Sequence, residues 1–454
     1  MSIFKAYDIR GTIPDQLDEQ AIKNIAWACV AYLEELSEDA SRTLSVVIGR
    51  DNRETSAAFA KTAVTTLKES GVDVIDIGLA STPYFYYASS ALSCDGGMMI
   101  TASHNPPQYN GCKLVGAHAS AIGADSGLPH IEALYKKGVK PKSKKPGTVT
   151  LLDMQNRYAD ESIVLGGGAK DITPLTVVVD TGNGVSALMC ETLFQKLPIR
   201  LIPLFFELDG TFPHHMPNPL EEKNTEMLRK TVVETHADIG IAMDADGDRV
   251  IFIDENGRAI SSDLITALLA IDVLTYAPGA TILYDLRSSR TVQETIRAHG
   301  GNAGVTRVGH AFIKTQMRKQ HALFAGELSG HFYYKFQDYG YFEASLATIV
   351  QMLRILSQEK KPLSEILQPL RRYWGTGEIN FEVANKAEML QKLERQFSDA
   401  SRIDKLDGIT LEYDEWWCNV RPSNTENLLR LTLEAKTKEL RDKKCEEIKK
   451  IIEK

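Results

Sequence analysis

Several classes of protein are excluded by what this sequence lacks. It contains no Gly-Lys pair, so it has no P-loop, in which a lysine follows a glycine to reach the phosphates of a nucleotide. Its six cysteines are scattered and include no Cys-x-x-Cys pair, which favours ordinary buried or semi-exposed thiols in a reducing compartment. Gly326–Gly330 reads Gly-Glu-Leu-Ser-Gly, which departs from the Gly-x-Ser-x-Gly turn of triad hydrolases.

Positive charge and long apolar runs are also scarce. The formal net charge is -8, which disfavours a large nucleic-acid surface. The most apolar stretch, residues 264–277, is interrupted by Asp272 and is too short to span a bilayer. The opening Met-Ser-Ile-Phe-Lys begins no apolar signal segment. We therefore expect a cytoplasmic protein with no membrane or nucleic-acid partner, in which the lysine-rich stretch Lys136–Lys145 is a linker.

The length of 454 residues exceeds that of one ordinary core and suggests roughly three or four domains. Three segments, at residues 45–77, 177–206 and 281–308, share one plan. Each has an apolar β-rich run, a polar turn, an amphipathic helix and a second apolar run. This spacing favours sheets with parallel strands covered by helices. Three unrelated α/β units are the alternative, because the repeat is weak in sequence identity.

Each of the three segments is followed by one more apolar strand and a polar loop. The loops are Thr101–Pro106, Asp244–Arg249 and Gly326–His331. In α/β sheets, ligands usually bind at the carboxyl ends of strands. We therefore expect three related domains, each of which contributes one loop to a single cleft.

The chain changes character after Lys360. Strands are expected near residues 379–383, 409–413 and 428–433, with helices at 387–397 and at the C-terminus. The predicted fold class is therefore α/β, with three related mixed α/β domains and a smaller α+β C-terminal domain around a central cleft. The predicted domain limits are residues 1–145, 146–253, 254–365 and 366–454.

Ser103 is the first candidate nucleophile. The residues after it, His104 to Pro107, include two prolines, which forbid a helix and leave the hydroxyl free to project. A serine that makes only a local turn hydrogen bond is the alternative, and the residues alone do not separate the two.

Three aspartates stand at alternating positions, Asp244, Asp246 and Asp248. Carboxylates so close together repel one another unless a cation joins them, and all-oxygen ligation suits Mg²⁺. A calcium EF-hand is a rival, because Glu255 stands where its last ligand would be. Arg249 replaces the glycine that an EF-hand needs, however, and the next residues are typical of a strand. We predict a magnesium site, with a solvated acidic turn as the alternative.

Two further loops carry hydrogen-bonding side chains. Glu327, Ser329 and His331 lie within one short loop; a carboxylate and a hydroxyl suit sugar hydroxyls, and His331 could act as a general acid or base. A structural histidine is the alternative, as it is for His310. The segment from Arg421 to Asn427, with Arg430 beyond it, offers arginines, hydroxyls and backbone N–H groups. Such donors suit a phosphate clamp, or alternatively a hydrogen-bonded turn.

Taken together, these loops resemble those of the α-D-phosphohexomutase family, over essentially the whole chain. The motifs, in order, are Phe4–Gly11, Thr101–Pro106, Asp244–Arg249, Gly326–His331 and Arg421–Thr425. They resemble the N-terminal motif, the phosphoserine loop, the metal loop, the sugar-recognition loop and the phosphate-binding loop of that family. The resemblance implies three related α/β domains and a smaller fourth domain around a central cleft.

The resemblance also implies roles for individual residues. Ser103 would be phosphorylated, and its phosphate would complete the shell of a Mg²⁺ ion held by Asp244, Asp246 and Asp248. The transferring phosphoryl would be surrounded by Arg10, His104, Lys113 and Arg249. The sugar would be contacted by His310, Glu327, Ser329 and His331, with proton transfer as a role for His331. The phosphate that does not react would be held by Arg421, Ser423, Asn424, Thr425 and Arg430.

The expected function is a phosphohexomutase that interconverts hexose 1-phosphate and hexose 6-phosphate through a phosphoserine and a hexose 1,6-bisphosphate, which also serves as activator. The loop Gly-Glu-Leu-Ser-Gly-His, with Leu328 in it, resembles that of the phosphomannomutase/phosphoglucomutase subgroup. A phosphoglucosamine mutase and a non-catalytic sugar-phosphate binding protein are the alternatives. A nucleotide-dependent oxidoreductase rests only on the weak Gly-x-Gly-x-x-Ala match at Gly182–Ala187. The expected partners are small hexose phosphates, and the expected state is a monomer or homodimer.

Overall fold

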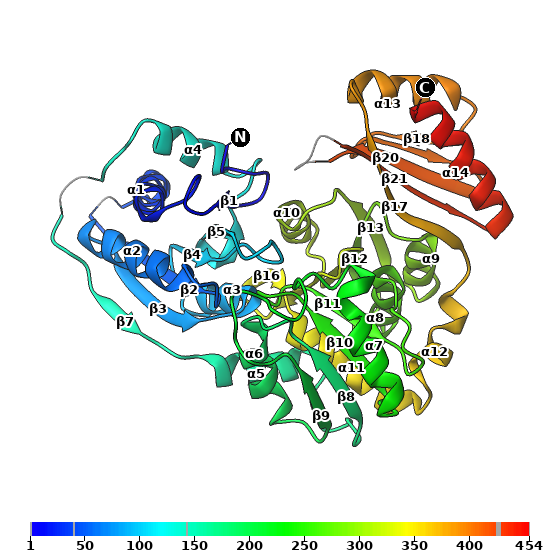
Figure 1. Ribbon diagram of the computed structural model, residues 1–454, viewed down its shortest axis with the longest axis horizontal. Helices are drawn as coiled ribbons and strands as arrows, with labels where there is room; N and C mark the ends of the chain where they lie inside the picture. The colour runs from blue at the N-terminus through cyan, green and yellow to red at the C-terminus, as the bar shows by residue number, and fades with distance from the viewer. Residues whose placement is uncertain (1, 40, 142–143, 424–427, 454) are drawn as a thin grey trace.

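The computed structural model of the protein describes residues 2–39, 41–141, 144–423 and 428–453 (Figure 1). Three of its sheets repeat one strand pattern, which confirms the predicted repeat and its fold class. In each, a central strand lies between two parallel neighbours, and one neighbour turns back into an antiparallel strand. In the first sheet the order is β3 (Asp73–Leu79), the central β2 (Ser45–Arg50), β4 (Gly96–Ile100) and the antiparallel β5 (Tyr109–Gly116). In the second it is β9 (Arg200–Leu204), the central β8 (Thr176–Asp180), β10 (Ile239–Met243) and the antiparallel β11 (Val250–Ile253). In the third it is β13 (Asn302–Thr306), the central β12 (Thr281–Asp285), β14 (Phe324–Gly326) and the antiparallel β15 (Phe332–Phe336).

Additional strands extend the first and third sheets. β1 (Ile9–Thr12) and β6 (Ser120–Ala121) pair with β5, and β16 (Gly340–Glu343) pairs with β15. β7 (Val149–Leu151) pairs with β3, so the first sheet extends past residue 145. The domain limits stated above stay a prediction.

The first sheet has two differently covered faces because its side chains alternate along each strand. Val46 and Ile48 of β2 belong to a core with α1 (Glu19–Leu36), α2 (Ser56–Glu69) and α4 (Leu128–Lys136). Val47 faces the other way, into a core shared with α3 (Thr82–Ala91). Residues 82–90 of α3 are all buried, as expected of a helix covered on every side.

The core that contains α3 runs on into the second and third sheets and ties the three repeats together. It includes α5 (Gln155–Leu165), α6 (Ser186–Phe194), α8 (Ser262–Tyr276) and α11 (Ser345–Glu359). The remaining helices of this part are α7 (Glu226–Glu234), α9 (Arg290–Ala298), α10 (His310–Gln320) and α12 (Leu363–Ile366). No helix among the described residues is long and apolar enough to cross a membrane.

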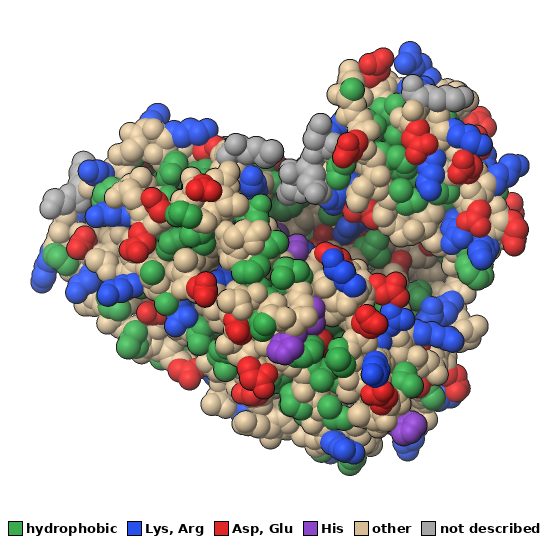
Figure 2. All heavy atoms as spheres, in the orientation of Figure 1, with side chains coloured by type: hydrophobic (Ala, Val, Ile, Leu, Met, Phe, Trp, Pro, Cys, Tyr) green, Lys and Arg blue, Asp and Glu red, His purple; other side chains and the backbone are tan. Residues whose placement is uncertain are grey.

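The C-terminal part is an antiparallel sheet in the order β17-β21-β20-β19-β18, which confirms the predicted α+β character. Its strands are β17 (Trp374–Glu382), β18 (Arg402–Asp404), β19 (Ile409–Glu412), β20 (Trp416–Pro422) and β21 (Leu428–Ala435), and its helices are α13 (Lys386–Gln396) and α14 (Lys438–Ile452). It forms a lobe of its own at the upper right of Figure 1. Figure 2 shows a hollow between this lobe and the part of the molecule that contains the first sheet.

The repeated pattern decides where the polar loops lie. Each predicted loop joins the outer parallel strand of its sheet to the antiparallel partner: β4 to β5, β10 to β11, and β14 to β15. Three equivalent positions in three equivalent sheets therefore carry the serine, the aspartates and the glutamate-histidine pair.

Candidate active site

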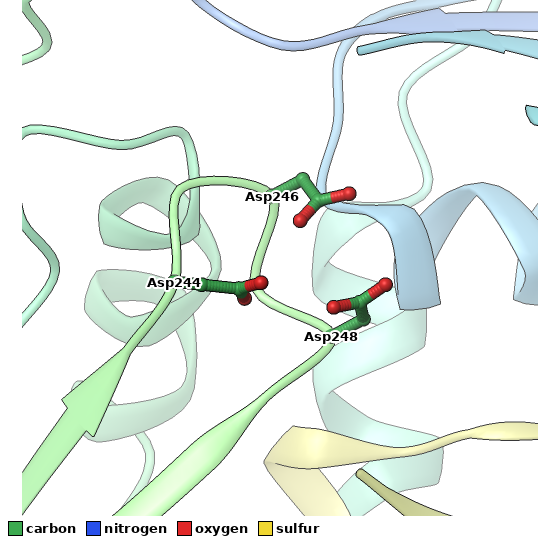
Figure 3. Close-up of side chains that lie close together, drawn as sticks. All are labelled: Asp244, Asp246 and Asp248. Atoms are coloured by element: carbon green, nitrogen blue, oxygen red, sulfur yellow. The ribbon is translucent and has the colours of Figure 1, made fainter. Parts of the chain in front are cut away.

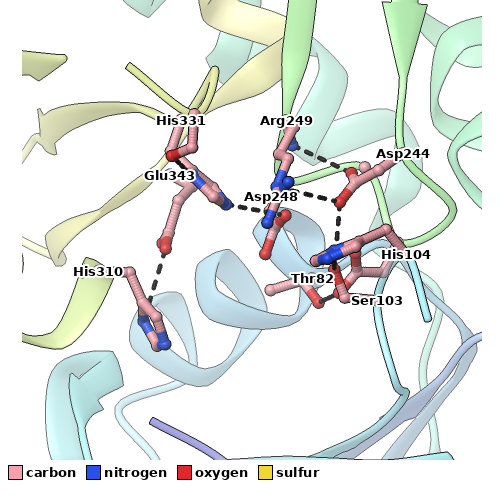
Figure 4. Close-up of polar contacts among 12 residues, drawn as sticks. Thr82, Ser103, His104, Asp244, Asp248, Arg249, His310, His331 and Glu343 are labelled. Carbon is pink, nitrogen blue, oxygen red and sulfur yellow. Dashed lines mark hydrogen bonds and ion pairs between the residues drawn. The ribbon is translucent and has the colours of Figure 1, made fainter. Parts of the chain in front are cut away.

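Ser103 lies in the loop between β4 and β5, only 2% exposed. Its backbone has φ +51°, a left-handed conformation that is uncommon for residues other than glycine. Its N–H donates to Thr101 Oγ1 at 2.9 Å, and its hydroxyl donates to Asp244 Oδ2 at 3.2 Å. The hydroxyl therefore points from the first repeat to the aspartate loop of the second (Figure 4).

Asp244, Asp246 and Asp248 come together in the loop between β10 and β11 (Figure 3). Each offers one ligand oxygen, and these oxygens lie within 4.8 Å of one another. All three residues are buried. Gly247 has φ +70°, a backbone that glycine adopts without strain, and this turn brings Asp248 back toward the other two. Glu255, which an EF-hand would use, instead bonds to Ser364.

The charge of this cluster fits a divalent cation. Asp246 Oδ2 accepts a hydrogen bond from Thr82 Oγ1 at 2.7 Å and lies 3.0 Å from Lys113 Nζ. Its other oxygen is buried and has no hydrogen-bond partner among the described residues. Burial, with the charges of Asp248 and Asp246, raises the pKa of Asp244 well above its usual value. Mg²⁺ prefers carboxylate oxygens as ligands, and these carboxylates need additional positive charge nearby to stay ionised.

Cationic side chains collect around Ser103 and the aspartates. Lys113 of β5 is buried and pairs with both Asp246 and Asp248. The Arg249 side chain lies 3.7 Å from Asp244. Arg10 of β1 pairs with Asp8 at 2.7 Å and donates to Asn105 of the serine loop at 2.5 Å. An acidic chain thus gathers positive charge around Ser103 and the aspartates.

His104 is held as a neutral ring. Its Nδ1 lies 3.1 Å from the Ser103 hydroxyl. Burial, with Arg249 and Arg10 nearby, holds the pKa of His104 well below its usual value. A neutral imidazole can donate to a phosphoryl oxygen through one nitrogen and accept through the other.

The sugar-loop residues meet at His331. Its Nδ1 lies 2.9 Å from Ser329 Oγ and 3.1 Å from Glu327 Oε2, while its Nε2 lies 3.2 Å from Asp248 Oδ1. Burial opposes a charge on this ring, but Asp248 and Glu327 outweigh burial and raise the pKa of His331 to about 9. A cation on Asp248 would offset part of that negative charge and lower this pKa again. His331 thus connects the loop of the third repeat to that of the second.

Glu327 stays ionised because its neighbours stabilise the negative charge. Tyr333 donates to its Oε2 at 3.0 Å, and Arg287 lies 3.3 Å from its Oε1. Burial opposes the charge, but His331 and Arg287 outweigh burial and lower the pKa of Glu327. An ionised carboxylate in this position can accept hydrogen bonds from sugar hydroxyls.

His310 is the first residue of α10 and lies near this group (Figure 4). Its Nδ1 is 3.7 Å from Glu343 Oε1. Burial, with Lys314 and Lys113, holds the pKa of His310 well below its usual value. The two histidines are therefore electrostatically different: His331 favours the charged form and His310 the neutral form.

The predicted phosphate clamp lies on the C-terminal sheet. Arg421 of β20 donates to Glu378 of β17 at 2.6 Å, and Arg430 of β21 lies 3.2 Å from the same carboxylate. Arg421 and Arg430 are cross-strand partners. Ser423 is also buried, and Asn424 and Thr425 lie outside the described residues.

Arg287 connects the loop of the third repeat to the C-terminal sheet. Besides contacting Glu327, it lies 3.6 Å from Glu378 and pairs with Asp285 at 2.8 Å. Sequence reasoning missed both Arg287 and Glu378, as well as Thr82 beside the aspartates. Arg287 had a signal, because it stands in the polar turn of the third repeat. Thr82 and Glu378 had no such signal, since each bonds to a partner that is distant in the sequence.

Models of four domains match this chain in order. The phosphoglucomutase/phosphomannomutase α/β/α domains I, II and III match residues 1–142, 160–257 and 261–373, and the C-terminal domain of the same family matches residues 378–451. The chain belongs to the phosphoglucomutase/phosphomannomutase family. As a member of this α-D-phosphohexomutase family it is a phosphohexose mutase, which is an isomerase.

Curated members of the family are similar over nearly their full length. A phosphomannomutase of Escherichia coli is 36% identical, with 96% of this chain and 95% of that protein covered. A phosphomannomutase/phosphoglucomutase of Pseudomonas syringae is 35% identical, with 96% and 92% covered.

Solved structures agree with the fold. A phosphoglucomutase/phosphomannomutase family protein from Burkholderia thailandensis has TM-score 0.90 at 32% identity, covering 99% of this chain and 96% of that one. An N-acetylphosphoglucosamine mutase of Aspergillus fumigatus, solved with GlcNAc-6P and magnesium, has TM-score 0.59 at 14% identity, covering 81% and 90%, and is similar in fold alone.

Proposed function

We propose that this enzyme interconverts the 1-phosphate and 6-phosphate of mannose, glucose or both, through a phosphoserine at Ser103 and a hexose 1,6-bisphosphate. The observation that carries the proposal is the 3.2 Å contact between the Ser103 hydroxyl and Asp244, at the edge of the buried aspartate cluster. A serine in that position can carry a phosphoryl group, and a bound cation can neutralise the charge of that group. Phosphoryl transfer depends mainly on such positioning and charge neutralisation.

We propose that Asp244, Asp246 and Asp248 hold Mg²⁺, with an oxygen of the phosphoserine as a further ligand. When bound, the ion would neutralise charge that develops on the phosphoryl oxygens. Lys113, Arg249, Arg10 and neutral His104 supply the other donors around the same group.

The transfer step uses side chains of this protein. A sugar hydroxyl oxygen forms a bond to phosphorus as the bond from phosphorus to Ser103 Oγ breaks. The hydroxyl proton passes to a nearby base, and the freed Ser103 oxygen takes up a proton, which restores the serine hydroxyl. His331 is our candidate for that base once its pKa has been lowered by a cation on Asp248. The bisphosphate then turns end for end, and the other phosphoryl returns to Ser103.

The far side of the cleft holds the phosphate that does not react. We propose Arg421, Ser423 and Arg430 for this role, with Asn424 and Thr425, while Glu327, Ser329 and His310 contact the sugar. Glu378 balances the charge of both arginines before substrate binds. A group of separate donors suits two orientations of the bisphosphate better than a single tight pocket.

The proposal for mannose or glucose rests on the Gly-Glu-Leu-Ser-Gly-His loop at residues 326–331 and is supported by the names of the relatives. The test is turnover of mannose 1-phosphate and glucose 1-phosphate with Mg²⁺ and a trace of hexose 1,6-bisphosphate, with Ser103→Ala beside the wild type. Activity that depends on Ser103 is the expected result. Turnover of glucosamine phosphate alone would move the substrate to an amino sugar, and binding without any turnover would refute the proposed reaction.

A further inference from the structure

Arg53 is joined to the backbone of the serine loop by an unusual number of hydrogen bonds. Its Nη2 donates to the carbonyls of Ser103 and Asn105, both at 2.6 Å. Its Nη1 donates to the carbonyls of Pro106 and Tyr109, at 2.9 and 3.1 Å. Arg53 is only 2% exposed, so these bonds lie out of water. One guanidinium thus holds the loop from Ser103 itself to the start of β5.

The turn that carries Arg53 recurs in all three repeats. A buried aspartate ends or follows the central strand of each sheet, and its Oδ1 accepts the backbone N–H two residues on. The pairs are Asp51 with Arg53, Asp180 with Gly182, and Asp285 with Arg287. In the third repeat the side chain at this position, Arg287, reaches Glu327 in the loop of its own sheet. In the second repeat this position is Gly182, which has no side chain. Arg53 and Arg287 are therefore equivalent residues of the first and third repeats, and each contacts the polar loop of its own sheet.

The second repeat closes over Arg53 from outside. The ring of Phe212 lies 5.0 Å from the Arg53 guanidinium carbon, and Phe212 is itself buried. Gly210 beside it lies so close that a Cβ would be 2.6 Å from the Asn52 carbonyl oxygen. Asn52 in turn donates to the Asn183 carbonyl at 2.8 Å. The guanidinium is thus fixed on one side by Asp51, at 3.2 Å, and covered by an aromatic ring on another.

We infer that Arg53 is a positioning residue for phosphoryl transfer, held in place by Phe212 of the second repeat. It keeps Ser103 in its left-handed backbone, so that the hydroxyl points to Asp244. Ser103 would relax to an ordinary backbone without these bonds, because nothing intrinsic to serine favours a positive φ. This inference rests on the proposed role of Ser103. Arg53 contacts neither the sugar loop nor the arginines of the C-terminal sheet, so its effect is confined to the transfer step.

The test compares Arg53→Lys and Phe212→Leu with the wild type. Lysine keeps the charge but has no planar fork to hold four carbonyls; leucine keeps an apolar side chain but has no ring to cover the guanidinium. The matched control is Arg354→Lys, since Arg354 is another buried arginine that pairs with an aspartate, Asp272, and a carbonyl, that of Gly166. We expect kcat to fall by about tenfold to a hundredfold in Arg53→Lys, because a displacement near 1 Å can have such an effect. KM for the sugar phosphate should change by less than about twofold.

Several outcomes decide the inference. Phe212→Leu should show a smaller fall in kcat with the same unchanged KM, and it serves as the test if Arg53→Lys does not fold. A fall in kcat no greater than that of Arg354→Lys, in a folded variant, would overturn the inference. So would a KM that rises in step with the fall in kcat. Full activity of Ser103→Ala, measured in parallel, would instead refute the proposed function, and the role of Arg53 would fall with it.

Discussion

Thr82 offers a sharp test of the metal site, because it touches the aspartate cluster without being a ligand. Its hydroxyl donates to Asp246 Oδ2 at 2.7 Å, and Lys113 lies 3.0 Å from the same oxygen. These two contacts hold the carboxylate so that its other oxygen is left for a cation. Thr82→Val removes the donor and nearly preserves the shape. A hydrogen bond to a charged group contributes about 1.5–3 kcal/mol. Loss of a residue that hydrogen-bonds a metal ligand commonly weakens metal binding about 10- to 100-fold.

We therefore expect Thr82→Val to raise the Mg²⁺ concentration that gives half-maximal turnover by about 10- to 100-fold. Because Lys113 remains in place, kcat at saturating Mg²⁺ should stay near the wild-type value. The control is Thr348→Val, which removes another buried hydroxyl, one that lies in α11 and donates to the carbonyl of Ala344 just before that helix. A Mg²⁺ requirement that matches this control within about twofold, well below the expected change, would refute the assigned role of Asp246 and its neighbours.

Three further changes test other parts of the account. Gly247→Ala should weaken Mg²⁺ binding, seen in calorimetric titration, because a side chain at φ +70° costs about 1–2 kcal/mol. Arg287→Met should lower stability to urea by about 3–5 kcal/mol and raise KM, because it strands buried carboxylates; exposed Arg297→Met should do neither. Burial lowers the pKa of His215, but Asp180 outweighs burial and raises it. The stability that His215→Asn removes should therefore be largest below about pH 6.5 and vanish as pH rises through the raised pKa.

The repeat and the loops could be predicted from the sequence because both leave local signals. Strands with apolar runs and helices with a 3.6-residue period are recognisable within about a dozen residues. Aspartates as closely spaced as Asp244, Asp246 and Asp248 indicate a cation site by themselves, since a bound cation relieves their repulsion. The amphipathic helix predicted within residues 45–77 is α2, at Ser56–Glu69.

Contacts between distant segments could not be predicted, because no local pattern records them. Thr82 bonds to a residue 164 positions away, and Arg421 to one 43 positions away. Glu378 sits beside a β-bulge in β17, where the alternation that marks a buried strand residue is interrupted. Arg53 is a buried cation in a polar turn, and nothing within the turn tells that its partners are four carbonyls of another loop.

The most direct test of the central claim is to follow the phosphoryl group on Ser103. The enzyme would be phosphorylated with labelled hexose 1,6-bisphosphate and separated from unbound bisphosphate. It would then be mixed rapidly with unlabelled mannose 1-phosphate or glucose 1-phosphate. We predict that label is found on the peptide containing Ser103 and leaves it at a rate no slower than kcat, appearing in sugar phosphate. Label that never reaches Ser103, or that leaves far more slowly than the enzyme turns over, would contradict the account.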